Sequence, residues 1–169
     1  WQPRAAAPAG RAPCPLLAAF HGWRYRSKLV DSMAFGSYNR SFRPARTSKD
    51  WLNRDEKEVD RYLSEERCSF RFTLNGYDSL FTALERLCDK ELLARAPKDL
   101  PVLFLSGDDD PVGDRGRGVQ KAAQSLRDAG MRQVEVKLYP GARHELLVEL
   151  NRQEVFADIG SFIQNQIQA

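Results

Sequence analysis

The sequence is poor in the residues that build metal centres and disulfide frameworks. Its three cysteines, Cys14, Cys68 and Cys88, are scattered and form no CxxC pair, and the chain has only two histidines in 169 residues. An odd and scattered set of cysteines argues against both a disulfide scaffold and a zinc site. We therefore expect free, buried thiols in a cytoplasmic protein, with no metal and no cofactor.

Long apolar runs are also missing. No stretch approaches the roughly 18 consecutive apolar residues of a membrane-spanning helix, so no transmembrane segment is expected. Pro3, Pro8, Pro13 and Pro15 interrupt the start of the chain and leave no signal-peptide pattern. Residues 1–23 begin as an Ala/Pro/Arg-rich segment without hydrophobic period, which predicts a disordered or linker-like tail. The first residue is Trp rather than Met, and we expect that sequence precedes it.

Acidic residues are scarce in the first part of the chain. Residues 1–49 contain nine Lys or Arg and one acid, Asp31, for a net charge of +8, whereas the whole chain carries +3 and the remainder therefore −5. Such a basic segment could contact phosphate head groups or nucleic acid. It could equally be a solvated surface or one covered by acidic protein. No zinc finger or aromatic–basic RNA motif is present, so we expect no nucleic-acid partner.

The most informative stretch is LPVLFLSGDDDPVG, residues 100–113. Its apolar run, closed by Ser106 and Gly107, predicts a strand that is buried on both faces. Val134, Val136 and Leu138 alternate with charged residues and predict a second strand near a sheet edge. A helical pattern over 119–129 separates the two strands. This β-α-β order predicts parallel strands joined by a right-handed crossover, and hence an α/β fold.

The sequence pattern predicts helices and loops for the rest of the chain. Helices are predicted over 29–35, from a capping box at Asn53 and Glu56, over 77–95, and from Asn151 to the end. No convincing strand precedes Leu100, so the buried strand has one partner where it needs two. A two-stranded sheet is marginal by itself, and a bare edge pairs readily with another chain. We expect that part of the sheet is missing, rather than that cryptic strands precede Leu100.

Two polar residues follow the two predicted strands. Asp110 and His144 are 34 positions apart, about one helix and one strand, which would bring them to the same edge of a parallel sheet. A carboxylate that fixes a histidine tautomer is two-thirds of a hydrolytic triad. The order Asp before His also matches the Ser…Asp…His order of α/β-hydrolases. The alternative is that GDDDP is only an acidic turn and His144 only a surface residue.

A family resemblance supports the first interpretation. The segments FLSGDDDPVGDRGRGV and LYPGARHELLVELNRQEVFADI resemble the C-terminal part of α/β-hydrolases, in the branch of lysophospholipases, monoacylglycerol lipases and serine aminopeptidase-like (S33) hydrolases. Upstream, FGSYNRSFRPARTSKDWLNRDEKEVDRYLSEERCSFRFT is similar to the helical cap of that branch. The resemblance implies a helical cap over 24–96 and a core segment over 97–169. It also implies Asp110 as the catalytic acid, with Asp108 and Asp109 as weaker candidates, and His144 as the base.

The sequence departs from this family at the nucleophile. The family pattern needs a G-x-S-x-G turn on an earlier strand, and no serine among the 169 residues has that context, Ser37 and Ser106 included. We therefore expect a serine hydrolase of carboxylic esters, such as lysophospholipids or monoacylglycerols, present as an incomplete chain that carries the acid and the base. Its expected partners are a missing N-terminal half or a second copy at the sheet edge. The alternatives are a non-catalytic binding or regulatory protein and an unrelated small α/β enzyme that uses Asp110 and His144 for proton transfer.

Overall fold

Two parallel strands form the centre of the C-terminal part of the chain. The structure is a computed structural model and describes residues 11–68, 70–87 and 89–168. Strand β1 (Val102–Gly107) pairs in parallel with β2 (Val134–Tyr139), with Val102 opposite Val134 and Gly107 opposite Tyr139. Both predicted strands and the α/β class are confirmed. No segment before Leu100 adds a third strand within the described ranges.

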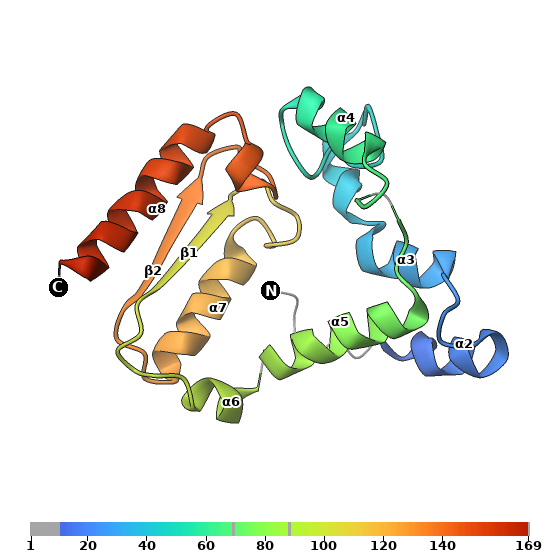
Figure 1. Cartoon of the computed structure of the whole chain (residues 1–169), viewed down its shortest axis with the longest axis horizontal. Helices are drawn as coiled ribbons and strands as arrows, with labels where there is room; N and C mark the ends of the chain where they lie inside the picture. Colours follow the sequence, from blue (N-terminus) through green and yellow to red (C-terminus); the bar gives the residue numbers. More distant parts are fainter. Residues whose placement is uncertain (1–10, 69, 88, 169) are drawn as a thin grey trace.

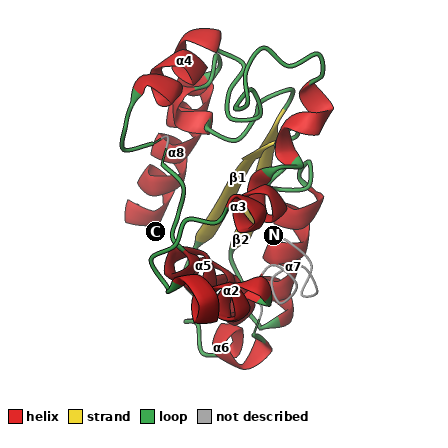
Figure 2. Ribbon diagram, turned by 90° about the vertical axis from the view of Figure 1, so that its right-hand side faces the viewer, coloured by secondary structure: helices red, strands yellow, loops and turns green. Residues whose placement is uncertain are grey.

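One helix covers each face of this sheet. Helices α7 (Arg117–Asp128) and α8 (Arg152–Ile167) lie on opposite sides of the strands, as both views show (Figures 1 and 2). The cluster on the α7 side includes Val102, Phe104, Ala123, Met131 and Val134. The cluster on the α8 side includes Leu105, Tyr139, Ala142, Leu146 and Val155. Successive residues of β1 thus face opposite helices, as the period of a strand requires.

The burial of β1 differs from the prediction. The four residues Val102–Leu105 are only partly covered, and full burial begins at Ser106. Helices α7 and α8 shield the two faces, but β2 pairs with only one edge of β1. The apolar run is therefore that of a central strand, while its position in the described structure is that of an edge strand.

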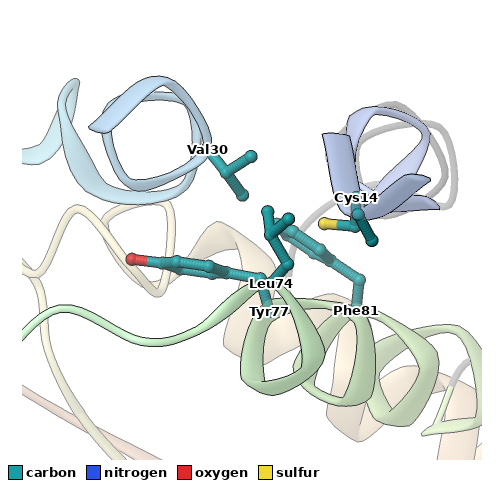
Figure 3. Packing of buried hydrophobic residues seen from close by; sticks show 6 residues of the cluster. Cys14, Val30, Leu74, Tyr77 and Phe81 are labelled. Carbon is teal, nitrogen blue, oxygen red and sulfur yellow. The ribbon is translucent and has the colours of Figure 1, made fainter. Parts of the chain in front are cut away.

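Helices make up the remainder of the fold. In chain order they are α2 (Pro13–His21), α3 (Lys28–Phe35), the 3-10 helix η1 (Tyr38–Phe42), α4 (Glu56–Ser64), α5 (Leu74–Leu87), α6 (Lys90–Ala94) and the short η2 (Leu146–Val148). Their core lies where α2, α3 and α5 meet, as Figure 3 shows for Cys14, Val30, Leu74, Tyr77 and Phe81. No helix in the described ranges has both the length and the apolar character needed to cross a bilayer.

The beginning of the chain is more ordered than predicted. Within the expected tail of residues 1–23, Pro13–His21 form helix α2, and the Cys14 side chain is fully buried against α5. Proline is tolerated in the first turn of a helix, where its missing N–H would have no partner, so the prolines begin α2 rather than prevent it. The expected burial of free thiols holds for Cys14 and is wrong for the exposed Cys68. Cys88 lies outside the described residues.

Two helix predictions need correction at their ends. The side chain of Asp55, not Asn53, caps α4 by accepting a hydrogen bond from Lys57 N at 3.0 Å. The single helix predicted over 77–95 is two helices, because Asp89 caps a new start at α6. A capping carboxylate favours a helix N-terminus and therefore interrupts a continuous helical pattern.

Candidate active site

The acidic candidate lies in the turn that follows β1. Asp110 is buried, with 6% of its surface exposed. Its Oδ1 accepts a hydrogen bond from Val112 N at 2.8 Å, and its carbonyl oxygen accepts one from Arg115 N at 2.8 Å. Backbone contacts thus fix the carboxylate on one side and leave Oδ2 for another partner.

That partner is His144, in the loop that follows β2. The imidazole Nδ1 lies 3.0 Å from Asp110 Oδ2, which confirms the predicted proximity of the two side chains. A carboxylate acceptor at Nδ1 selects the tautomer that carries its proton there and leaves Nε2 as the basic nitrogen. The His144 side chain is 40% exposed while Asp110 is buried, so solvent reaches the imidazole but little of the carboxylate. The geometry therefore favours a histidine oriented for proton transfer.

The two loops meet because a glycine ends β1. A Cβ atom at Gly107 would overlap with the carbonyl group of Ala142 in the loop after β2. Asp109 N donates to that carbonyl at 3.1 Å, and Asp108 Oδ1 accepts from Gly141 N at 2.6 Å. Asp108 thus joins the two loops. Of the three neighbouring aspartates, Asp110 is the one that contacts His144.

A buried glutamate holds the histidine loop to the helical part of the chain. Glu149 is fully buried and accepts hydrogen bonds from Arg54 N at 3.1 Å, Arg54 Nε at 3.0 Å, Arg143 N at 3.1 Å and Leu150 N at 2.8 Å. The sequence analysis missed this residue. A glutamate in an amphipathic segment is expected to be exposed to solvent. Its partner Arg54 is 95 positions earlier, and no local sequence pattern indicates this pairing.

The residue before the histidine strengthens the same attachment. Arg143 Nη1 donates to the carbonyl oxygens of Asp50 at 2.5 Å and Asn53 at 3.0 Å, and Glu145 N donates to Leu52 O at 2.9 Å. Residues on both sides of His144 are therefore bonded to the backbone of segment 50–53. That segment places the Trp51 ring 5.3 Å from the imidazole.

An apolar cavity of about 530 Å³ opens beside His144. Its wall is formed mainly by Tyr62, Leu105, Leu146, Leu147, Val148 and Val155. The volume lies within the range of small-molecule sites, about 300–1,000 Å³. Glu145 also borders the cavity, and burial raises the pKa of its carboxyl group above the ordinary value. The site thus combines a polar pair with an apolar space large enough for an acyl chain.

No serine hydroxyl accompanies the pair in the part of the chain that the structure describes. Ser106 is buried on β1, and its hydroxyl donates to Gly107 O at 3.1 Å. Ser37 precedes η1, and no serine hydroxyl of the described residues hydrogen-bonds to His144. The same residues contain no group of three or more His, Cys, Asp or Glu side chains that could hold a metal ion.

Comparison with protein families identifies the family of the chain. The family described as serine aminopeptidase, S33, matches residues 5–151, which is most of the chain. The chain therefore belongs to this family of hydrolases. A comparison with curated proteins found no match.

Solved structures extend the comparison to three dimensions. A thermostable carboxyl esterase from Bacillus coagulans is 25% identical, with a TM-score of 0.83 over 94% of this chain and 53% of that chain. A lipase in its open form is 23% identical, with a TM-score of 0.74 and coverage of 97% and 54%. A monoglyceride lipase variant from Saccharomyces cerevisiae is 20% identical, with a TM-score of 0.59 and coverage of 93% and 49%. The chain thus shares the partial fold and spans about half the length of these enzymes.

Proposed function

We propose that this chain supplies the acid and the base of an enzyme that hydrolyses carboxylic esters. The observation that carries the proposal is the 3.0 Å contact between His144 Nδ1 and Asp110 Oδ2 beside an apolar cavity. Membership of the S33 family and likeness to a carboxyl esterase support the same reaction class. In this proposal residues 24–96 are the cap and 97–169 are the core segment.

The proposed reaction follows the chemistry of a serine hydrolase. His144 Nε2 takes the proton of a serine hydroxyl as the oxygen attacks the ester carbonyl, and later returns the proton to the leaving alcohol. Asp110 holds the imidazole in the required tautomer and stabilises its protonated form. Water then hydrolyses the acyl–serine intermediate by the same route. The reaction needs no metal or cofactor.

The serine is proposed to come from polypeptide outside these 169 residues. Two observations support this: the sequence has no G-x-S-x-G, and the chain covers 53% of the esterase it resembles. Strand β1 has a free edge in the described structure, and its half-covered Val102–Leu105 run suits a further strand there. We propose that a nucleophile-bearing segment pairs with this edge, with a second copy of the chain as the competing partner.

The proposed substrates are esters with an apolar acyl chain, of the monoacylglycerol or lysophospholipid type. The apolar wall of the 530 Å³ cavity supports an acyl chain next to His144. A cytoplasmic location is proposed as well, supported by the free thiols of Cys14 and Cys68.

A non-catalytic binding or regulatory protein is the second candidate. It is favoured by one observation, namely that no serine hydroxyl of the described residues bonds to His144. The same cavity would then hold an ester or a fatty acid without cleaving it. The two candidates differ in covalent chemistry, which makes them separable by experiment.

The test begins with the coding DNA upstream of Trp1. An in-frame G-x-S-x-G segment, expressed together with residues 1–169, should give a protein that a fluorophosphonate labels on that serine. His144→Ala should slow the labelling by at least about 100-fold, the usual contribution of a positioned general base. His21→Ala, at the other histidine, is the matched control and should leave the rate unchanged.

Two outcomes would contradict the hydrolase proposal. One is a reading frame without the motif, and the other is labelling that does not depend on His144. The acid–base pair has an independent readout in the 169-residue chain. In ¹⁵N NMR the neutral imidazole of His144 should carry its proton on Nδ1, and Asp110→Asn should redistribute it between the two nitrogens.

A further inference from the structure

A second cavity, of about 640 Å³, lies within the helical part of the chain. We call it the aromatic–basic cavity, after the residues that define it: Phe35, Lys49, Trp51, Tyr62, Arg67 and Arg71. It differs in chemistry from the apolar cavity beside His144, because three cationic side chains line it against one carboxylate, that of Asp31.

The ammonium group of Lys49 is surrounded by aromatic rings. Its Nζ lies 6.0 Å from the ring centre of Phe35, 5.8 Å from that of Trp51 and 6.0 Å from that of Tyr62. No carboxylate of the described residues forms an ion pair with it. An ammonium has three hydrogen-bond donors, and ring faces attract its charge without accepting those bonds well. Lys49 is therefore a cation held at the cavity with its donors available.

Arg71 is a second cationic residue of the cavity, and one of its hydrogen-bond donors has no partner. Its Nε is buried and has no hydrogen-bond partner, and the nearest carboxylate oxygen, Asp31 Oδ2, is 3.7 Å away. Tyr77 already donates its hydroxyl proton to Asp31 Oδ1 at 2.5 Å. Arg67, by contrast, is paired with both carboxylate oxygens of Glu65, at 2.9 and 2.8 Å. Arg71 is thus within ion-pair distance of Asp31 but has an unused N–H donor, whereas Lys49 has no carboxylate partner among the described residues.

The aromatic–basic cavity adjoins the apolar cavity. Tyr62 and Cys68 line both spaces, so the two cavities share a wall. Trp51 lines the aromatic–basic cavity, and its ring centre is 5.8 Å from Lys49 Nζ and 5.3 Å from the ring centre of His144, which lines the apolar cavity. A ligand that occupies both cavities would have one part near His144 and another part near Lys49 and Arg71.

We propose that the aromatic–basic cavity binds an anionic group, a phosphate or a carboxylate, of an ester whose acyl chain occupies the apolar cavity. The ester part rests on the proposed function, whereas the anion site rests on Lys49 and Arg71 alone. Phosphate and carboxylate oxygens accept the hydrogen bonds that these side chains leave unused. Among the esters considered above, the site selects those with a negatively charged head group.

The experiment compares matched ligands on the 169-residue chain. Binding of 1-monooctanoylglycerol, its 3-phosphate ester, glycerol 3-phosphate and inorganic phosphate is measured by calorimetry below the micelle concentration of each lipid. The octanoyl phosphate should bind at least about tenfold more tightly than the neutral lipid at low salt, because its phosphate carries a charge of about −1.5 to −2 near partly buried cations. Added salt should reduce the difference. Comparable affinity of glycerol 3-phosphate or inorganic phosphate would identify a free-anion site and overturn the acyl-linked ligand.

Variants separate this inference from the proposed function. Lys49→Met keeps the apolar part of the side chain and should abolish the preference for the phosphate ester, whereas Lys49→Arg should retain that preference. Lys57→Met, on the exposed face of α4, is the control and should leave the preference unchanged. Arg71→Gln is a second variant in case Lys49→Met does not fold. Equal binding of the charged and neutral lipids, or a preference unchanged in folded Lys49→Met, would overturn the inference. His144→Ala should leave the preference intact, so loss of the hydrolase proposal alone would not remove it.

Discussion

Glu149 gives the sharpest test of how the loop that carries His144 is held. Its carboxylate is fully buried and accepts four hydrogen bonds, three from backbone N–H groups and one from the Arg54 guanidinium. Glu149→Ala removes every one of these acceptors at once. Glu149→Gln retains one oxygen and removes the charge.

The magnitude follows from the surroundings of each partner. Breaking a buried ion pair from one side typically costs about 3–5 kcal/mol, because the remaining charge is left without compensation. The Arg54 side chain is 28% exposed, so water can solvate part of its charge. We therefore expect Glu149→Ala to lower the free energy of unfolding by about 3 kcal/mol, the lower end of that range. Glu149→Gln should lower it by about 1–2 kcal/mol.

The assay is urea-induced unfolding followed by far-ultraviolet circular dichroism at pH 7. Glu154→Gln is the matched control, because Glu154 pairs with Lys137 at 3.1 Å while half exposed, and its loss should cost less than about 1 kcal/mol. Amide exchange should also accelerate at Arg54 and Arg143 in Glu149→Ala. Equal free energies of unfolding for Glu149→Ala and Glu154→Gln would contradict the inference that Glu149 holds the His144 loop to segment 50–54.

Three further predictions concern the loops, the cavity and the sheet edge. Gly107→Ala should destabilise the fold by about 2–4 kcal/mol and shift the ¹⁵N signals of His144, because the new Cβ overlaps with the Ala142 carbonyl. Unchanged stability and unchanged His144 signals would contradict the close approach of the two loops. Glu145→Gln should raise the free energy of unfolding at pH 7, since burial raises the folded-state pKa of Glu145 and so penalises its charged form. This gain in stability should disappear as the pH falls through the raised pKa toward the ordinary value of 4.5. A gain in stability that persists in acid would have another cause. The 169-residue chain should self-associate in sedimentation experiments through the free edge of β1, whereas a monodisperse monomer with strong amide protection at Leu103 and Leu105 would contradict this.

The strands and the Asp–His pair were predictable because both depend on short stretches of sequence. An apolar run closed by turn residues defines β1, and alternation with charged residues defines β2. Once two strands are parallel neighbours, their carboxyl ends coincide, and the contact between Asp110 and His144 follows from topology. The catalytic role of the pair is still a prediction.

The residues that hold the pair in place were not predictable in the same way. Arg54 and Glu149 are 95 positions apart, and Arg143 reaches backbone carbonyl groups 90 and 93 positions earlier. Contacts of this length depend on how the helical segment packs against the loop after β2, which no local pattern encodes. Helix α2 was missed for a related reason, because it is stabilised by packing of Cys14 on α5 rather than by a hydrophobic period of its own.

Segment 50–54 lies close to the aromatic–basic cavity and to the Asp110–His144 pair. Asp50 is itself fixed: burial would raise its pKa, but hydrogen bonds from Thr47 and from Arg46 N at 2.6 Å outweigh burial and lower it. The carbonyl oxygen of this residue then accepts from Arg143, next to His144, and the neighbouring Trp51 ring is close to both Lys49 Nζ and the imidazole. Lys49, the Trp51 ring and the two carbonyl oxygens that accept from Arg143 therefore lie within residues 49–53. The cation proposed to bind a ligand anion and the backbone that holds the His144 loop are thus neighbours in sequence.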